Sequence, residues 1–273
     1  MSALLALLLA AAPAQPAPAR CPTAAEAPAA ANAFLKGIST SPLQFEADRS
    51  EAITALARRE AARRAIFTGT PGNGPFGIVS HYSALARSAP DVRRLELFTR
   101  AAEDQFARIS QQIIAARTDW AEDLSDGAAA YLGQLIGFEA CRADAENTAW
   151  LKADIAKNGW YRISAFGPDA DNAAWLLVQH SDADPGFQAE MLFVLGKLVA
   201  ARETAPRNRA YLFDRVAVAE KRLQLYGTQG ACTAKGKWEP HRLESPGTVD
   251  RLRKEAGLEP LADYKKVMGR ACP

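Results

Sequence analysis

The sequence lacks the motifs that identify the common classes of hydrolase and metal-binding domain. It has no G-x-S-x-G nucleophile motif, and no two of its four cysteines have the C-x-x-C spacing of a zinc site. Its formal net charge is only +2, so bulk electrostatics indicate neither a nucleic-acid partner nor a membrane-surface partner. These absences leave two broad classes of function, a binding module and an enzyme of unassigned chemistry.

A literal G-x-G-x-x-G at Gly72, Gly74 and Gly77 lacks the setting of a nucleotide-binding loop. A dinucleotide fingerprint follows a strand and opens a helix, so that backbone N–H groups meet the pyrophosphate. Here a helix is expected before the glycines, and Pro75 removes one of the donors. No Lys-Ser or Lys-Thr follows, which excludes a P-loop. We therefore predict no nucleotide cofactor, and nothing else in the sequence indicates another one.

The start of the chain is typical of a secretory signal peptide. Ala3 to Ala12 is an apolar run, far shorter than the roughly 20 residues of a membrane-spanning helix, and small residues follow in an A-x-A pattern up to Ala19. Positive charge is missing before Ala3. Cys21 raises the alternative of a lipoprotein, which Arg20 beside the cleavage point disfavours. We expect residues 1–19 to be removed, leaving a periplasmic or secreted protein without a transmembrane segment.

The four cysteines all follow the expected cleavage point, and an oxidising compartment lets them pair. Three connectivities are possible. We favour Cys21 with Cys141 and Cys232 with Cys272, because each pair then closes one half of the chain and ties down a terminus. A metal site is the alternative, and the cysteine spacing argues against it.

Hydrophobic periodicity predicts a mainly α, multi-helix fold with one small antiparallel β-hairpin near the C-terminal third. Asp91 is expected to cap a long helix reaching about Arg117, with Asp104 and Arg108 forming an i,i+4 ion pair along it. The glycines and prolines of residues 68–90 indicate a loop or linker. Residues 20–90 are interpreted as an N-terminal helical and linker region, and residues 91–273 as a helical domain. Other expected elements are helices near 28–36, 46–67, 119–141 and 144–157, and hairpin strands at 224–229 and 237–243 within about 223–243.

Ordered polar islands give the chain a resemblance to a known family. These islands are EDQ-x-x-R at 103–108, D-x-x-N at 144–147, GW at 159–160, AW-x-x-x-QH-x-D at 174–182, D-P-x-FQ at 184–188, AYL-x-DR at 210–215, Q-x-YGTQ at 224–229 and GL-x-PL-x-x-Y at 257–264. Together they resemble a bacterial domain-of-unknown-function family, number six-six-two-four, over roughly residues 95–266. Tyr161 stands where the family usually has proline. The resemblance implies a fold unit and a residue set that includes Asp104 and Asn147, but no reaction.

His180 is the main candidate for a catalytic base. It is one of three histidines, and an unperturbed pKa near ~6.5 suits proton transfer at neutral pH. Asp182 is close enough in sequence to orient it. Two alternatives stay open: a helix-terminal histidine favoured by the helix dipole, and a metal set of His180, Asp182 and Asp184. Asp184 is already explained as the N-cap before Pro185, so we predict no metal.

Two more islands complete the candidate site. Asp214 and Arg215 fall within a helix among apolar residues, so a structural ion pair and a ligand contact are both possible. In a strand, Gln224, Tyr226 and Thr228 would share one face, which suits the wall of a polar pocket, with Gln229 beside it. The alternative is an edge strand whose polar face meets solvent.

We therefore expect an exported cell-envelope protein that binds an unidentified small molecule or envelope component in a polar pocket. The alternative is a hydrolase or transferase that uses His180 as general base with Asp182 or Asp214. If His180 acts on a ligand, His180→Ala removes binding or activity and leaves the melting temperature nearly unchanged.

Overall fold

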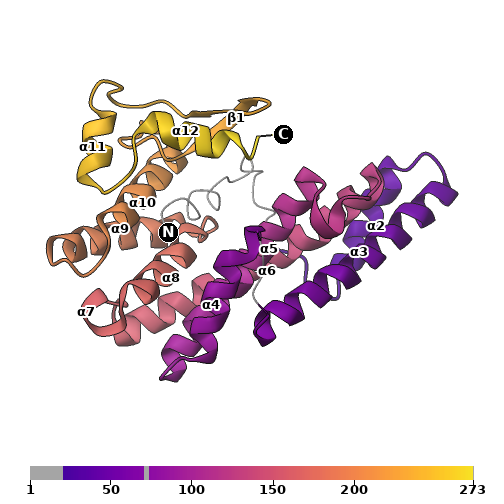
Figure 1. Ribbon diagram of the computed structural model, residues 1–273, viewed down its shortest axis with the longest axis horizontal. Helices are drawn as coiled ribbons and strands as arrows, with labels where there is room; N and C mark the ends of the chain where they lie inside the picture. Colours follow the sequence, from indigo (N-terminus) through magenta and orange to yellow (C-terminus); the bar gives the residue numbers. More distant parts are fainter. Residues whose placement is uncertain (1–20, 71–73, 273) are drawn as a thin grey trace. The chain divides into compact units, whose positions relative to one another are not determined.

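The computed structural model describes residues 21–70 and 74–272. The predicted signal peptide at residues 1–19 lies outside these described residues. The fold is mainly α-helical with one small two-stranded antiparallel sheet in the C-terminal third, as the sequence predicts (Figure 1). The described chain divides into two compact units, residues 21–144 and 145–272, and each is described by itself.

The N-terminal unit is built from long helices with well-defined starts. Ser41 caps α3 by accepting a hydrogen bond from the amide of Gln44 at 3.1 Å, and Asp91 caps α5 through the amide of Arg94 at 2.8 Å. Its helices are α2 (Ala27–Ile38), α3 (Pro42–Thr68), α4 (Gly77–Arg87), α5 (Val92–Ala116) and the first part of α6 (Asp126–Asn158), with short 3-10 turns at Gly74–Phe76 and Asp119–Ala121.

The apolar stripe of α5 forms the centre of this unit. Phe98 and Phe106 are fully or almost fully buried, and the ring of Phe98 stacks against Tyr82 of α4 with centroids 6.2 Å apart. The prediction that residues 68–90 are a loop or linker is wrong for 77–87, because α4 lies there. Its buried residues Val79, Tyr82, Ser83 and Ala86 follow helical spacing, a signal that the surrounding glycines and prolines obscured.

Helix α6 is continuous where the sequence predicted two helices, near 119–141 and 144–157. The good helix formers Arg142, Ala143, Ala145 and Glu146 make up most of residues 141–147, and neither glycine nor proline interrupts the segment. Gly159 then adopts a φ of +74°, as expected for the residue that ends the helix. Asp144 and Thr148 therefore lie one turn apart on a single helix. That residues 91–273 form a separate helical domain stays a prediction.

The C-terminal unit packs its helices around a chain of aromatic rings. Tyr211 contacts Trp175 at 5.7 Å and Tyr264 at 6.2 Å between centroids, and Tyr264 contacts Trp238 at 5.4 Å. All four side chains are buried. The elements that supply and surround them are α7 (Ile163–Phe166), α8 (Pro168–Gln179), α9 (Pro185–Ala200), α10 (Pro206–Ala219), β1 (Gly230–Ala234), β2 (Lys237–Pro240), α11 (Val249–Glu255) and α12 (Leu261–Gly269).

The hairpin starts later in the chain than predicted. Strand β1 pairs antiparallel with β2, with Gly230 opposite Pro240 and Cys232 opposite Trp238. The prediction that residues 224–229 form the first strand is wrong, since only Gln224 makes an isolated bridge, to Leu243. Gly227 adopts a φ of +65°, which a regular strand does not contain. The alternation argument that placed three polar side chains on one face therefore does not hold.

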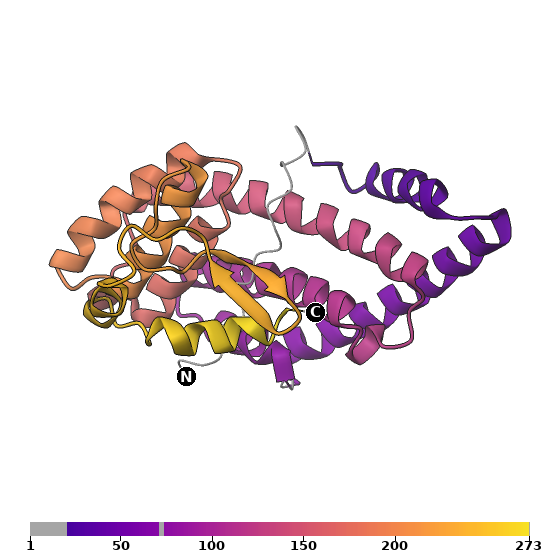
Figure 2. The same cartoon turned by 90° about the horizontal axis from the view of Figure 1, so that it is seen from above.

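Two disulfides, Cys21–Cys141 and Cys232–Cys272, confirm the predicted pairing. The first closes a sequence separation of 120 residues in the N-terminal unit, and the second closes 40 residues beside the hairpin. The two strands of the hairpin are drawn as arrows in Figure 2. Disulfides persist in oxidising compartments, so this pairing fits an extracellular or otherwise oxidising location. Within the described residues, no helix combines the length and apolar character needed to cross a membrane.

Candidate functional site

Asp214 is held by the segment that follows α10. One carboxylate oxygen accepts hydrogen bonds from the backbone amides of Leu225 at 2.9 Å and Tyr226 at 3.1 Å. The other oxygen accepts hydrogen bonds from the backbone amide of Thr228 at 2.8 Å and from its hydroxyl at 3.0 Å. Burial raises the pKa of the Asp214 carboxyl, and these four hydrogen bonds oppose the rise. The carboxylate therefore shapes the turn at residues 225–228.

Gln224 has a similar structural role. Its side-chain oxygen accepts the amide of Gln229 at 2.8 Å, and its nitrogen donates to the carbonyls of Gln229 and His241, both at 2.9 Å. Gln224 is 0% exposed and Thr228 is 1% exposed. These two residues join α10, the turn and the hairpin to one another. Of the predicted wall, only Tyr226 and Gln229 remain partly exposed.

Asp182 and Arg215, which come from different polar islands, form an ion pair that was not predicted from the sequence. Arg215 donates from Nε to Asp182 at 2.7 Å, a second guanidinium nitrogen contacts the other carboxylate oxygen, and Gln188 donates to Asp182 at 3.1 Å. Burial would raise the pKa of Asp182, but the Arg215 guanidinium brings it below its usual range. Arg215 also faces Gln229 at 3.4 Å. The three residues form a partly exposed cluster, Asp182–Arg215–Gln229.

His180 lies at the C-terminal end of α8. Its backbone amide donates to the carbonyls of Leu176 and Leu177, and the residue is 6% exposed. The next residue, Ser181, accepts a hydrogen bond from Thr148 of α6 at 2.9 Å. The structure thus places His180 at a helix end, as predicted, and buries it. Both carboxylates predicted to act with His180 have other partners: Asp214 accepts hydrogen bonds from backbone amides, and Asp182 forms an ion pair with Arg215.

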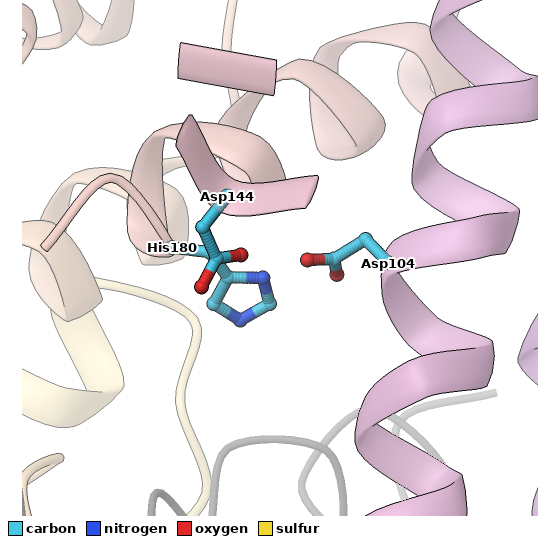
Figure 3. Close-up of side chains that lie close together, drawn as sticks. All are labelled: Asp104, Asp144 and His180. Atoms are coloured by element: carbon cyan, nitrogen blue, oxygen red, sulfur yellow. The ribbon is translucent and has the colours of Figure 1, made fainter. Parts of the chain in front are cut away.

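A second charged cluster lies in the N-terminal unit, on α5 and α6. Arg108 donates to Asp104 at 3.2 Å, which confirms the predicted i,i+4 pair, and to Asp144 at 2.5 Å. The carboxylates of Asp104 and Asp144 point toward each other in Figure 3. Burial would lower the pKa of Arg108, and the two carboxylates reverse this and raise it. Two carboxylates and one guanidinium leave this cluster, Asp104–Arg108–Asp144, with one net negative charge.

Two carboxylates of the N-terminal unit carry ligand chemistry suited to a divalent metal. Asp104 and Asp144 offer carboxylate oxygens that lie within 4.8 Å of each other. The set His180, Asp182 and Asp184 fits a metal poorly. Asp184 caps α9 by accepting a hydrogen bond from the amide of Phe187 at 2.9 Å, and it accepts a second one from Lys152 at 2.5 Å. Asp182 forms an ion pair with Arg215.

Asp171 and Arg253 are among the buried polar residues that the sequence reasoning missed. Asp171 is 1% exposed and accepts hydrogen bonds from Trp160 at 2.8 Å and Asn208 at 3.0 Å. Arg253 is 0% exposed and donates to the carbonyls of Glu259 and Tyr226 at 2.6 and 2.7 Å. Trp160 in the Gly-Trp island was the available signal for Asp171. Nothing in the local pattern of α11 distinguished Arg253 from its exposed neighbours.

The polar islands therefore fall into both units, and a family comparison covers them together. The sequence model of a "Family of unknown function (DUF6624)" matches residues 90–272, which is more than half of the chain. The chain belongs to the DUF6624 family. The DUF6624 match begins just before α5 and ends at Cys272, so it includes both charged clusters and the turn around Asp214. No curated protein and no solved structure matches the chain.

Proposed function

We propose that this DUF6624 protein is an exported ligand-binding or interaction module of the cell envelope. The observation that carries the proposal is the state of Asp182 and Asp214, the two carboxylates predicted to act with His180. Asp214 accepts four hydrogen bonds from its own turn, and Asp182 is held by Arg215. Each of the two carboxylates predicted to act with His180 thus holds another group of the protein in place. This weakens the hydrolase or transferase alternative.

The proposed ligand contact is the cluster Asp182–Arg215–Gln229. The side chain of Asp182 is 59% exposed, and that of Arg215 is 11% exposed. Asp182 fixes the guanidinium, so a ligand meets a charged group whose orientation is already set. Gln229 adds an amide that both donates and accepts hydrogen bonds. Such a surface suits a small polar molecule or a polar envelope component.

The two disulfides support the exported location. Export itself rests on the apolar start of the chain and on the pairing of all four cysteines. Fractionation of cells that produce the full chain tests this part of the proposal. We expect the mature protein outside the cytoplasm with its N-terminus near residue 20, and an uncleaved cytoplasmic protein contradicts it.

The binding part is tested by thermal-shift screening of small polar molecules, with and without a chelator. A specific ligand raises the melting temperature of the wild type and not of Arg215→Gln. Arg251→Gln is the matched control, because Arg251 is 62% exposed and lies in a surface i,i+4 pair with Glu255. Stabilisation that the chelator removes identifies a metal-dependent ligand. Equal shifts in all three proteins contradict the assignment of the cluster.

A further inference from the structure

A groove lies at the turn between α2 and α3, outside the DUF6624 match. It has a volume of about 600 Å³, and its lining includes Lys36, Ser39, Thr40, Ser41, Phe45 and Arg49. The turn lies at the far right of Figure 2, where α2 leads into α3. It belongs to residues 20–90, for which the family assignment predicts no role.

The groove carries a net positive charge. Lys36 and Arg49 supply two cations, and Glu46 supplies one carboxylate. Lys36 lies 5.6 Å above the ring of Phe45 and pairs with no carboxylate among the described residues. Arg49 approaches Glu46 only to 3.8 Å, and its buried Nε has no acceptor in the described structure. An anionic group in the groove would supply the acceptor that Arg49 Nε lacks.

The N-terminus of α3 opens at the same place. This helix is 27 residues long, and its cap Ser41 lines the groove. Pro42 has no N–H and the amide of Gln44 is bonded to Ser41, so this terminus contributes the field of the helix dipole, which favours an anion. The cations and the helix terminus thus favour the same class of ligand.

Exposed apolar side chains flank the groove. Leu43 is 85% exposed, the most of any large apolar side chain in the described structure, and Ile38 is 49% exposed. Phe34 on α2 and Ile53 on α3 are also exposed. Apolar residues beside basic ones are the composition of a surface that lies at a membrane interface.

We propose that the α2–α3 turn docks on an anionic phospholipid surface. The groove takes the lipid phosphate between Lys36 and Arg49, and Ile38 and Leu43 enter the boundary of the acyl chains. The near-zero net charge of the whole chain does not oppose this, since basic residues within a Debye length of the surface govern the attraction. The proposal is independent of the cluster Asp182–Arg215–Gln229.

Vesicle flotation of the mature chain tests the proposal. We expect binding to vesicles that contain phosphatidylglycerol, weaker binding at high salt, and none to pure phosphatidylcholine. Lys36→Gln and Arg49→Gln should each weaken binding roughly five-fold, from about 1 kcal/mol for each basic residue near an anionic surface. Leu43→Asp should remove it. Phe193→Asp and Lys235→Gln, exposed residues of the C-terminal unit, are the controls and should bind as the wild type does.

Circular dichroism establishes that each variant is folded, and Leu43→Ser replaces Leu43→Asp if the aspartate variant is not. A parallel titration with inorganic phosphate separates a lipid headgroup from a free anion. Binding of inorganic phosphate with no vesicle binding overturns the proposal. Vesicle binding that is equal for both lipid compositions, or equal for groove and control variants, overturns it as well.

Discussion

Asp214 accepts two hydrogen bonds from Thr228, one from the backbone amide and one from the hydroxyl. With the amides of Leu225 and Tyr226, this relationship fixes the turn that leads from α10 to the hairpin. Asp214, a catalytic candidate in the sequence, is thereby a structural acceptor for the turn.

Asp214→Ala should lower the free energy of unfolding by about 3–5 kcal/mol, because several buried donors lose their acceptor at about 1–3 kcal/mol each. Urea unfolding measures the change. Asp263→Ala is the control: Asp263 is 56% exposed in a pair with Lys266, and its loss should cost less than about 0.5 kcal/mol. A cost below about 1 kcal/mol for Asp214→Ala contradicts the structural role.

Gly227→Ala should destabilise the protein more than Gly236→Ala. Both glycines have positive φ, +65° and +69°, so the backbone cost of alanine is similar, about 1 kcal/mol. A Cβ at Gly227 would lie 3.1 Å from Leu243 and 3.2 Å from Leu261, whereas nothing lies within 4 Å of one at Gly236. The difference between the two melting temperatures isolates this contact. Equal losses would show that the turn has room at Gly227.

Asp182 should make stability depend on acid pH. Arg215 lowers its pKa in the folded state, so its contribution is present above the unfolded value near ~3.9 and is lost as pH falls through the lower folded value. Melting temperatures of wild type and Asp182→Asn should therefore differ above about pH 5 and converge toward about pH 2. A constant difference across this range would show that the pair with Arg215 does not perturb Asp182.

Non-reducing peptide mapping should recover Cys21 linked to Cys141 and Cys232 linked to Cys272. Loop-closure entropy predicts that reducing them costs about 5 and about 4 kcal/mol, for separations of 120 and 40 residues. Melting temperatures with and without reductant measure the combined loss. Free thiols in the untreated mature protein contradict the pairing.

The features predicted from the sequence share a local cause. Asp91 and Asp184 cap helices because their side chains reach amides three residues on, and the i,i+4 pair of Asp104 and Arg108 needs only a helix. The disulfide pairing followed from the placement of four cysteines. These inferences require no knowledge of tertiary contacts.

The features that sequence reasoning missed depend on distant residues. Alternation along 224–229 indicated a strand, but Asp214 draws three backbone amides of this segment toward α10. Likewise, Arg59 belongs to a run of arginines typical of a solvated surface. In the structure it is 0% exposed, donates to Glu139 at 2.7 Å and to Ser110 at 2.9 Å, and lies 4.7 Å above the ring of Phe106. Spacing within one helix does not predict such partners.

The most direct test of the proposed binding function compares ligand affinity with turnover in wild type, Arg215→Gln and His180→Gln. His180 is 6% exposed, so glutamine disturbs its buried surroundings less than alanine does. Calorimetric titration of a ligand found by thermal shift should show binding to the wild type, at least ten-fold weaker binding to Arg215→Gln, and the same ligand recovered unchanged. Undiminished affinity in Arg215→Gln, or conversion of the ligand that His180→Gln abolishes at an unchanged melting temperature, would contradict the binding-module account.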